Sequence, residues 1–126
     1  MPQACALLFG ALSLVVAAFQ VALVLGAPWG EYTLGGRWSG ALPVAVRVLP
    51  GLSAVLLLFF AVVVVARAGV AFPSIAEFAF TGVWAVVAYC ALGSIANAFT
   101  PSRRERMIWL PVVLGMLVLS LVVALS

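Results

Sequence analysis

A stripe of small and polar side chains is the part of this sequence best suited to contact a ligand. Cys90, Ser94 and Asn97 recur at intervals of four and three residues in an otherwise apolar stretch, which places them on one face of an α-helix. Ser13 and Gln20 lie seven residues apart in an earlier apolar stretch and also share a face. These side chains could hydrogen-bond a ligand, or they could join neighbouring helices in a membrane, where small and amide residues allow close packing. Both interpretations stay open, and Gln20, Ser94 and Asn97 are candidate ligand contacts.

Arginines and tryptophans form a second candidate group. Three arginines stand just before the last apolar stretch, where the free N–H groups and positive dipole end of a helix N-terminus also favour anions. Together they could hold a phosphate or carboxylate head group while tryptophans cover the apolar part of an amphiphile. The alternative is that the arginines only orient the chain and attract anionic lipid. The candidates are Arg103, Arg104, Arg106, Trp29, Trp38 and Trp109.

Glu31 is the one acid for which the sequence predicts no helix-capping role. An uncompensated carboxylate near a membrane interface is costly, so we expect Glu31 to pair with Arg104 or Arg106. An acid beside arginines could also carry out acid–base chemistry on a lipid head group. Glu31 is therefore a candidate ligand contact, and a membrane enzyme is one function to consider.

Missing residue types exclude several kinds of chemistry. The chain has no His, Asp or Lys, so one chain cannot form a Ser-His-Asp or Cys-His arrangement, a zinc site with His ligands or a Lys Schiff base. No charge falls in the middle of an apolar stretch, which argues against a proton-driven exporter. Cys5 and Cys90 lie inside apolar stretches and are expected to be buried thiols. We predict no catalytic residue, metal site or cofactor, and no binding to nucleic acid.

Four long apolar stretches must position all of these residues. The chain is 67% hydrophobic and only 7% charged, against about 25% charged residues in soluble domains. Stretches 4–26, 48–66, 78–99 and 107–125 contain no charged residue, and each is long enough to cross a bilayer, which takes about 20 residues. The first stretch has no preceding Lys or Arg and is followed by Pro28, so we expect a helix of the mature protein rather than a cleaved signal peptide.

The sequence thus predicts an all-α membrane protein: an antiparallel four-helix transmembrane bundle forming a single domain over residues 1–126. The expected helices cover approximately 4–26, 43–67, 75–99 and 103–125. Two Ser-x-x-Glu motifs, Ser74 with Glu77 and Ser102 with Glu105, predict capping boxes at the starts of the third and fourth helices.

The connection between the first two helices has a pattern of its own. Gly35-Gly36 separates two short segments, 29–34 and 37–40, which predicts a β-hairpin because both turn positions need the positive φ that Gly supplies freely. The alternative is a Gly-rich loop whose Trp and Tyr side chains form an aromatic belt at the lipid head groups. The two descriptions can coexist.

The arginines also predict how the chain is oriented. Arg37 and Arg47 accompany the first connection, a cluster fills the third, and only Arg67 borders the second. The positive-inside rule places the first and third connections in the cytoplasm. We therefore expect a multi-pass membrane protein with both termini periplasmic.

Two segments carry a resemblance. Gly26-Ala27-Pro28-Trp29-Gly30, together with Asn97 and Ser102-Arg103-Arg104-Glu105-Arg106, resembles uncharacterised small four-helix inner-membrane proteins of GC-rich bacteria. The resemblance covers most of the chain. It implies the bundle and the bacterial inner (cytoplasmic) membrane, and it brings no activity.

The leading functional interpretation is a protein that binds or transports a lipid or other hydrophobic small molecule. Membrane lipids are the expected partners, and we expect a homo-oligomer because four helices of this size enclose little volume. The alternative is an accessory or assembly subunit that acts by helix packing with another membrane protein. A membrane enzyme acting on a lipid head group is the third.

Overall fold

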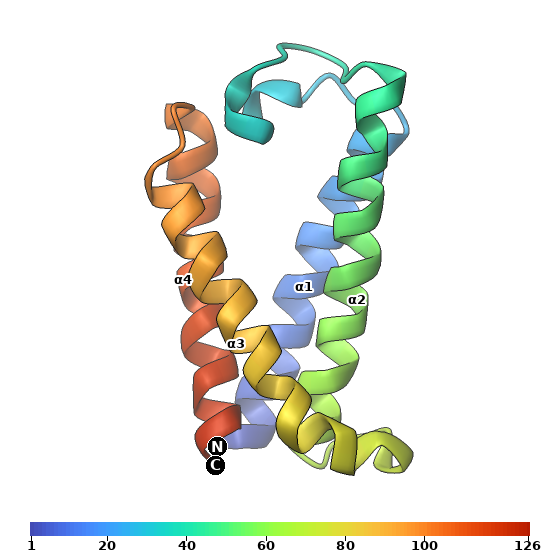
Figure 1. Ribbon diagram of the computed structural model, residues 1–126, viewed down its shortest axis with the longest axis vertical. Helices are drawn as coiled ribbons and strands as arrows, with labels where there is room; N and C mark the ends of the chain where they lie inside the picture. The colour runs from blue at the N-terminus through green and yellow to red at the C-terminus, as the bar shows by residue number, and fades with distance from the viewer.

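The computed structural model describes residues 1–126 and confirms the predicted all-α four-helix bundle (Figure 1). Both termini lie at one end, which we call the terminal end, and the first and third connections lie at the other, which we call the loop end. All four helices are long and apolar enough to cross a membrane, so the chain is a small polytopic membrane protein. The helices are α1 (Pro2–Val24), α2 (Val48–Arg67), α3 (Ala76–Ala98) and α4 (Arg103–Leu125).

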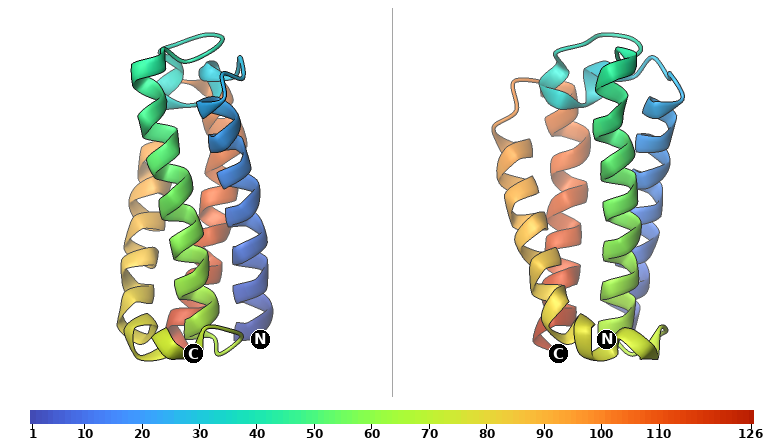
Figure 2. Two further views of the ribbon diagram at one scale, coloured as in Figure 1. Left: turned by 90° about the vertical axis from the view of Figure 1, so that its right-hand side faces the viewer. Right: turned by 45° about the vertical axis from the view of Figure 1, so that its right-hand side comes forward.

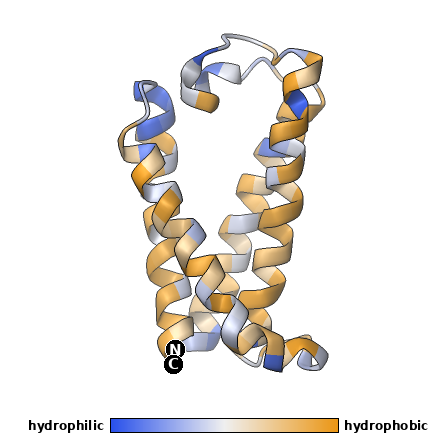
Figure 3. Cartoon of the chain, viewed as in Figure 1, coloured by the Kyte–Doolittle hydropathy of each residue, from blue (hydrophilic) through white to orange (hydrophobic).

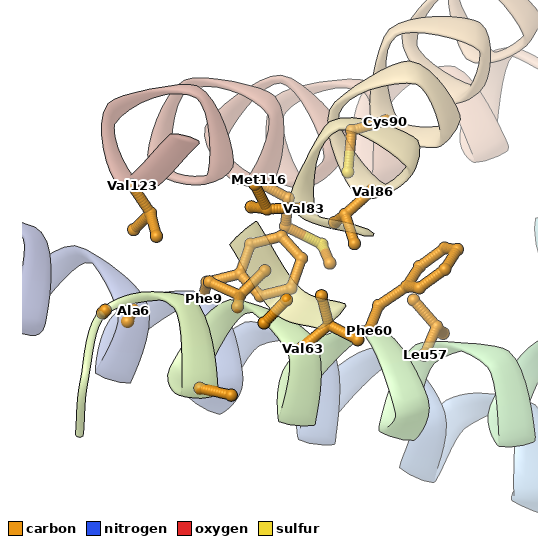
Figure 4. Packing of buried hydrophobic residues seen from close by; sticks show 14 of the residues in the cluster. Ala6, Phe9, Leu57, Phe60, Val63, Val83, Val86, Cys90, Met116 and Val123 are labelled. Atoms are coloured by element: carbon orange, nitrogen blue, oxygen red, sulfur yellow. The ribbon is translucent and has the colours of Figure 1, made fainter. Parts of the chain in front are cut away.

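The tightest packing lies in the half of the bundle nearest the termini. Phe9, Val63, Val86 and Val123, one from each helix, are fully buried there (Figure 4). α1 packs mainly against α2, and α3 packs mainly against α4. The two pairs diverge toward the loop end, as Figure 1 and the right-hand view of Figure 2 show. The core therefore closes one end of the bundle and leaves the other end more open.

The outward faces of the helices suit a lipid solvent. Large apolar side chains such as Leu14, Val55 and Leu92 are exposed along them. Hydrophobic residues cover most of the length of each helix, and hydrophilic residues gather toward the two ends (Figure 3). Such an exposed apolar surface is favourable only when hydrocarbon covers it.

Arg67 connects the helix ends at the terminal end. Its guanidinium donates to the carbonyl oxygens of Ala124 at 3.4 Å and Ser126 at 2.7 Å and lies over the ring of Phe80. The last carbonyls of a helix lack partners within the helix and carry the negative dipole end. Arg67 therefore caps α4 as well as ending α2.

The predicted capping box at Ser74 is wrong. Phe72 adopts a left-handed conformation with φ of 55°, and Pro73–Ile75 then forms a short 3-10 helix, η4. Ser74 consequently lies inside that turn. α3 begins at Ala76, with Ile75 at the N-cap and no side-chain cap.

The predicted capping box at Ser102 is half formed. The Ser102 hydroxyl accepts from the Glu105 N–H at 3.1 Å, but the Ser102 N–H donates to Thr100 rather than to Glu105.

The predicted β-hairpin is also wrong, because the first connection contains no strand. It forms two single-turn 3-10 helices, η1 (Gly30–Tyr32) and η2 (Leu34–Gly36), before η3 (Val44–Arg47) leads into α2. One backbone hydrogen bond, from the Gly30 N–H to the Gly40 carbonyl, joins the two arms. Side chains of α4 bind the backbone groups that a strand ladder would need, and this competition is the physical reason for the difference.

Candidate functional site

Residues 29–40 fold over the loop end of the bundle, and we call them the lid. The carboxylate of Glu31 accepts from the guanidinium of Arg104 at 2.6 Å. This confirms the pairing predicted for Glu31. Both side chains are partly open to solvent, so the ion pair orients the lid more than it stabilises it.

Three further hydrogen bonds attach the lid to α4 and its N-cap. The Ser102 hydroxyl donates to the Glu31 carbonyl at 2.9 Å. The indole N–H of Trp109 donates to the Tyr32 carbonyl at 2.8 Å, and the Gly35 N–H donates to the Glu105 carboxylate at 2.9 Å. Each bond serves a backbone group that has no partner in a regular element, as buried and half-buried backbone requires.

Glycine at two lid positions makes this path possible. A Cβ on Gly30 would lie 2.6 Å from the Trp38 carbonyl oxygen and 2.7 Å from that of Gly40. Gly36 has φ of +72°, and a Cβ there would lie 2.9 Å from the Ser102 Cβ. The lid can therefore approach itself and α4 only because both residues lack a side chain.

Aromatic rings fix the lid against the first helix. Trp29 stacks on Phe19 of α1 with ring centroids 6.0 Å apart, and Phe19 also contacts Trp109 at 4.7 Å. Trp38 instead lies under the guanidinium of Arg37 at 5.0 Å. The ring cluster thus joins lid, α1 and α4, and is consistent with an aromatic belt at this face.

A cavity of about 180 Å³ lies between the helices on the inner side of the lid, and it is partly open to the surroundings. Its wall includes residues of all four helices and one residue of the lid. The polar members of the wall are Gln20, Thr33, Ser53, Tyr89, Asn97 and Glu105, and the apolar members include Val16, Leu57, Val112 and Met116.

Most of the polar members lie nearer the loop end than the apolar members, whereas Tyr89 lies deeper, with its ring 5.0 Å from that of Phe60. Gln20 stands near the end of α1, Asn97 near the end of α3 and Glu105 near the start of α4, all at the loop end. Leu57 and Met116 lie near the middle of their helices. The cavity therefore has a polar mouth under the lid and an interior that is apolar apart from Tyr89 and Cys90.

The structure brings together only some of the residues singled out in the sequence. Gln20, Asn97 and Trp109 line the cavity. Trp29, Glu31 and Trp38 belong to the lid, and Ser94 is buried with its hydroxyl donating to the Cys90 carbonyl.

The three arginines of α4 do not line the cavity. Arg104 is paired with Glu31, Arg106 donates to the Thr100 carbonyl at 3.0 Å, and Arg103 is exposed. In the first connection, Arg47 donates to the Leu42 carbonyl at 3.0 Å. The guanidiniums of Arg104, Arg106 and Arg47 thus hold local structure around the loop end.

Four polar residues of the wall had no predicted part in a site: Thr33, Ser53, Tyr89 and Glu105. Glu105 was assigned to the capping box, because a Glu three residues after Ser102 has that role most directly. No sequence signal pointed away from this role, because the competing donor, the Gly35 N–H, lies 70 residues away along the chain. Ser53 lies four residues before Leu57 and shares its helix face, a spacing that could have pointed to an inward position.

No family model matches the chain, and no curated protein or solved structure matches it either.

Proposed function

We propose that this protein binds a lipid or other hydrophobic small molecule, with one apolar chain in the cavity and the polar end of the molecule under the lid. The observation that supports this most directly is the arrangement of the wall, polar at Gln20, Asn97 and Glu105 and apolar at Leu57 and Met116. An amphiphile has the same polarity along its length. Transport of the same ligand would further require the lid to open.

The size of the cavity favours a single chain. Its wall follows α4 from Glu105 to Met116, a rise of about 16 Å at 1.5 Å per residue. A volume of about 180 Å³ over that length is narrow, and it is below the roughly 300 to 1,000 Å³ typical of sites that enclose a drug-sized ligand. A bulkier part of the ligand would remain outside the cavity.

The bonding of Asn97 supports ligand contact over helix packing. Its amide donates at 2.8 Å to the Gly93 carbonyl of its own helix and to no other helix. An amide that joins helices would bond across the interface instead. The Asn97 carbonyl oxygen thus remains available at the mouth of the cavity.

We also propose that the protein resides in the inner membrane of a bacterium, with both termini periplasmic. The arginine distribution supports this orientation. Arg67, the one arginine at the terminal end, is occupied by the carbonyls of Ala124 and Ser126. Its position there therefore has a structural reason.

An assembly role is a second candidate, supported by a different surface. An almost wholly apolar groove of about 430 Å³ follows the outer face between α1 and α2, with Gly10 and Ala61 in its wall. Small residues of this kind allow a further helix to approach closely in a bilayer. A second copy or another membrane protein could occupy the groove, whereas the cavity is formed by one chain alone. Loss of a larger assembly in Ala61→Leu would support this role.

The proposed binding is tested by filling the cavity. Ser53→Phe places a ring into the wall, while Val55→Phe adds a ring on the lipid-facing side of the same helix, where Val55 is 67% exposed. Both variants and the wild type are purified in one neutral detergent, and molecules that co-purify are quantified by mass spectrometry. We expect a stoichiometric molecule in wild type and Val55→Phe that is lost in Ser53→Phe. Equal content in all three proteins would contradict the proposal.

A further inference from the structure

We propose that the head group bound at the mouth of the cavity is an ammonium, held by the carboxylate of Glu105. This inference rests on the proposed function and specifies the chemical class of its ligand. It differs from the phosphate or carboxylate ligand that the arginine cluster suggests.

Glu105 is the only charged side chain in the wall of the cavity. Its carboxylate accepts one hydrogen bond, from the Gly35 N–H at 2.9 Å, and no arginine lies within ion-pair distance of it. Two carboxylate oxygens can accept about four hydrogen bonds. Most of the accepting capacity of Glu105 is therefore free, and a bound cation would use it.

Two of the three arginines beside Glu105 in the sequence are engaged elsewhere, and the third, Arg103, is exposed and does not line the cavity. Arg104 pairs with Glu31, and Arg106 donates to the Thr100 carbonyl. The Glu105 carboxylate is stabilised only by the N-terminal end of α4 and one lid N–H, which offset part of the cost of removing it from water. A ligand that brings its own positive charge completes this arrangement, whereas an anionic head group would face the carboxylate.

The neutral residues beside Glu105 also accept hydrogen bonds. The amide of Asn97 donates to Gly93, which leaves its carbonyl oxygen as an acceptor at the mouth. Gln20 supplies a second amide oxygen and Thr33 a hydroxyl. The indole N–H of Trp109 is already bound to the Tyr32 carbonyl, whereas the Gln20 amide and the Thr33 hydroxyl can donate as well as accept. A mouth rich in acceptors suits a head group that carries several N–H donors.

An ammonium on an apolar chain could be a free amphiphilic amine or the amine of a lipid head group. The test uses undecyl chains that carry an ammonium, a phosphate or a glucoside and are brominated on the carbons nearest the head group. Bromine quenches tryptophan on contact, and Trp109 lines the cavity near its mouth, where it bonds the lid. The protein is held in phosphatidylcholine nanodiscs. Quenching that persists in Ser53→Phe is subtracted as the contribution of lipid-facing tryptophans. A brominated lysophosphatidylethanolamine serves as the lipid arm.

Glu105→Gln removes the charge and keeps an oxygen for the Gly35 N–H. Glu77→Gln is the matched control, since Glu77 is an exposed acid at the terminal end. We expect the wild type and Glu77→Gln to bind the ammonium probe about tenfold more tightly than the phosphate or glucoside probe, as a charge-assisted hydrogen bond implies. Glu105→Gln should lose this preference. If the lysophosphatidylethanolamine probe binds as tightly as the simple ammonium probe, the natural ammonium belongs to a lipid head group. If it binds more weakly, the natural ligand is a free amphiphilic amine.

Two results would overturn the inference in distinguishable ways. Cavity-specific quenching that is equal for all three head groups, or strongest for the phosphate and unchanged in Glu105→Gln, would leave the binding function standing and refute the ammonium. Absence of any quenching sensitive to Ser53→Phe would refute the binding function together with the inference.

Discussion

Serines and acids that occupy the same sequence motif form different bonds in the two places where the motif occurs. Ser74 and Ser102 stand in the same Ser-x-x-Glu motif, yet only Ser102 caps a helix. Glu105 uses its carboxylate on the lid, while Glu77 remains exposed. A motif of four residues predicts local geometry, but a partner far along the chain decides which residue uses which bond.

The two serines offer a matched pair of variants. Ser102→Ala removes both the cap on the Glu105 N–H and the bond to the Glu31 carbonyl, so we expect it to lower the free energy of unfolding by about 1 kcal/mol or somewhat more. Ser74→Ala removes no cap and should be close to neutral. Chemical unfolding of both variants in one detergent measures the difference. Equal stabilities would show that the cap contributes nothing.

Glu31 allows a sharper test of the lid. Glu31→Gln keeps the shape of the side chain and weakens the bond to Arg104, so protease cleavage within residues 29–40 should increase by a few-fold. The increase is small because the ion pair is solvent-exposed and the backbone bonds remain. Mapping the cleavage sites by mass spectrometry gives the measurement, and co-purifying ligand should fall in parallel. Unchanged cleavage together with unchanged ligand would leave residues 29–40 as a membrane anchor only.

Among the structural elements, the four helices can be predicted from the sequence, whereas the conformation of the lid cannot. The four helices follow from long apolar stretches, because backbone groups in lipid must bond within their own segment. The lid is a different case, since its backbone groups bond to Ser102, Glu105 and Trp109, which lie about 70 residues away along the chain. Local turn chemistry therefore predicted a hairpin where tertiary contacts produce two 3-10 turns.

Gly30 tests whether the lid must keep its close approach. Gly30→Ala would place a methyl group 2.6 Å from the Trp38 carbonyl, which forces the lid to shift and should raise both proteolysis and ligand loss above the levels of Glu31→Gln. Gly115→Ala is the control, because a Cβ there meets nothing within 4 Å. If Gly30→Ala resists proteolysis as well as the wild type does, the lid does not need the close approach at Gly30.

At the scale of the whole molecule, the bundle is closed at one end and hollow at the other. The sequence indicated Gln20 and Asn97 among the candidate ligand contacts, and both line the cavity. It could not predict the cavity itself, because the divergence of the helix pairs depends on packing around residues such as Phe9 and Val63 at the terminal end. Hydrophobicity determines that helices span a bilayer but not the angle between them.

Orientation in the membrane is a property of the whole chain. If the loop end faces the cytoplasm, alkaline phosphatase fused after Ser126 should be active, and a fluorescent protein that folds only in the cytoplasm should be dark there. Charge reversal of the cluster at Arg103, Arg104 and Arg106 should weaken this bias. A bright fluorescent fusion with silent phosphatase in the wild type would reverse the proposed orientation.

The most direct test of ligand binding is a crystal structure grown in a lipid mesophase with undecyl probes brominated at the far end of the chain. Bromine scatters anomalously, so its position can be located without interpreting weak density. We predict an anomalous peak inside the bundle between Leu57 and Met116, with density extending to Gln20 and Asn97 under an ordered lid. Bromine found only on the outer faces of the helices, with side chains filling the cavity, would contradict the account.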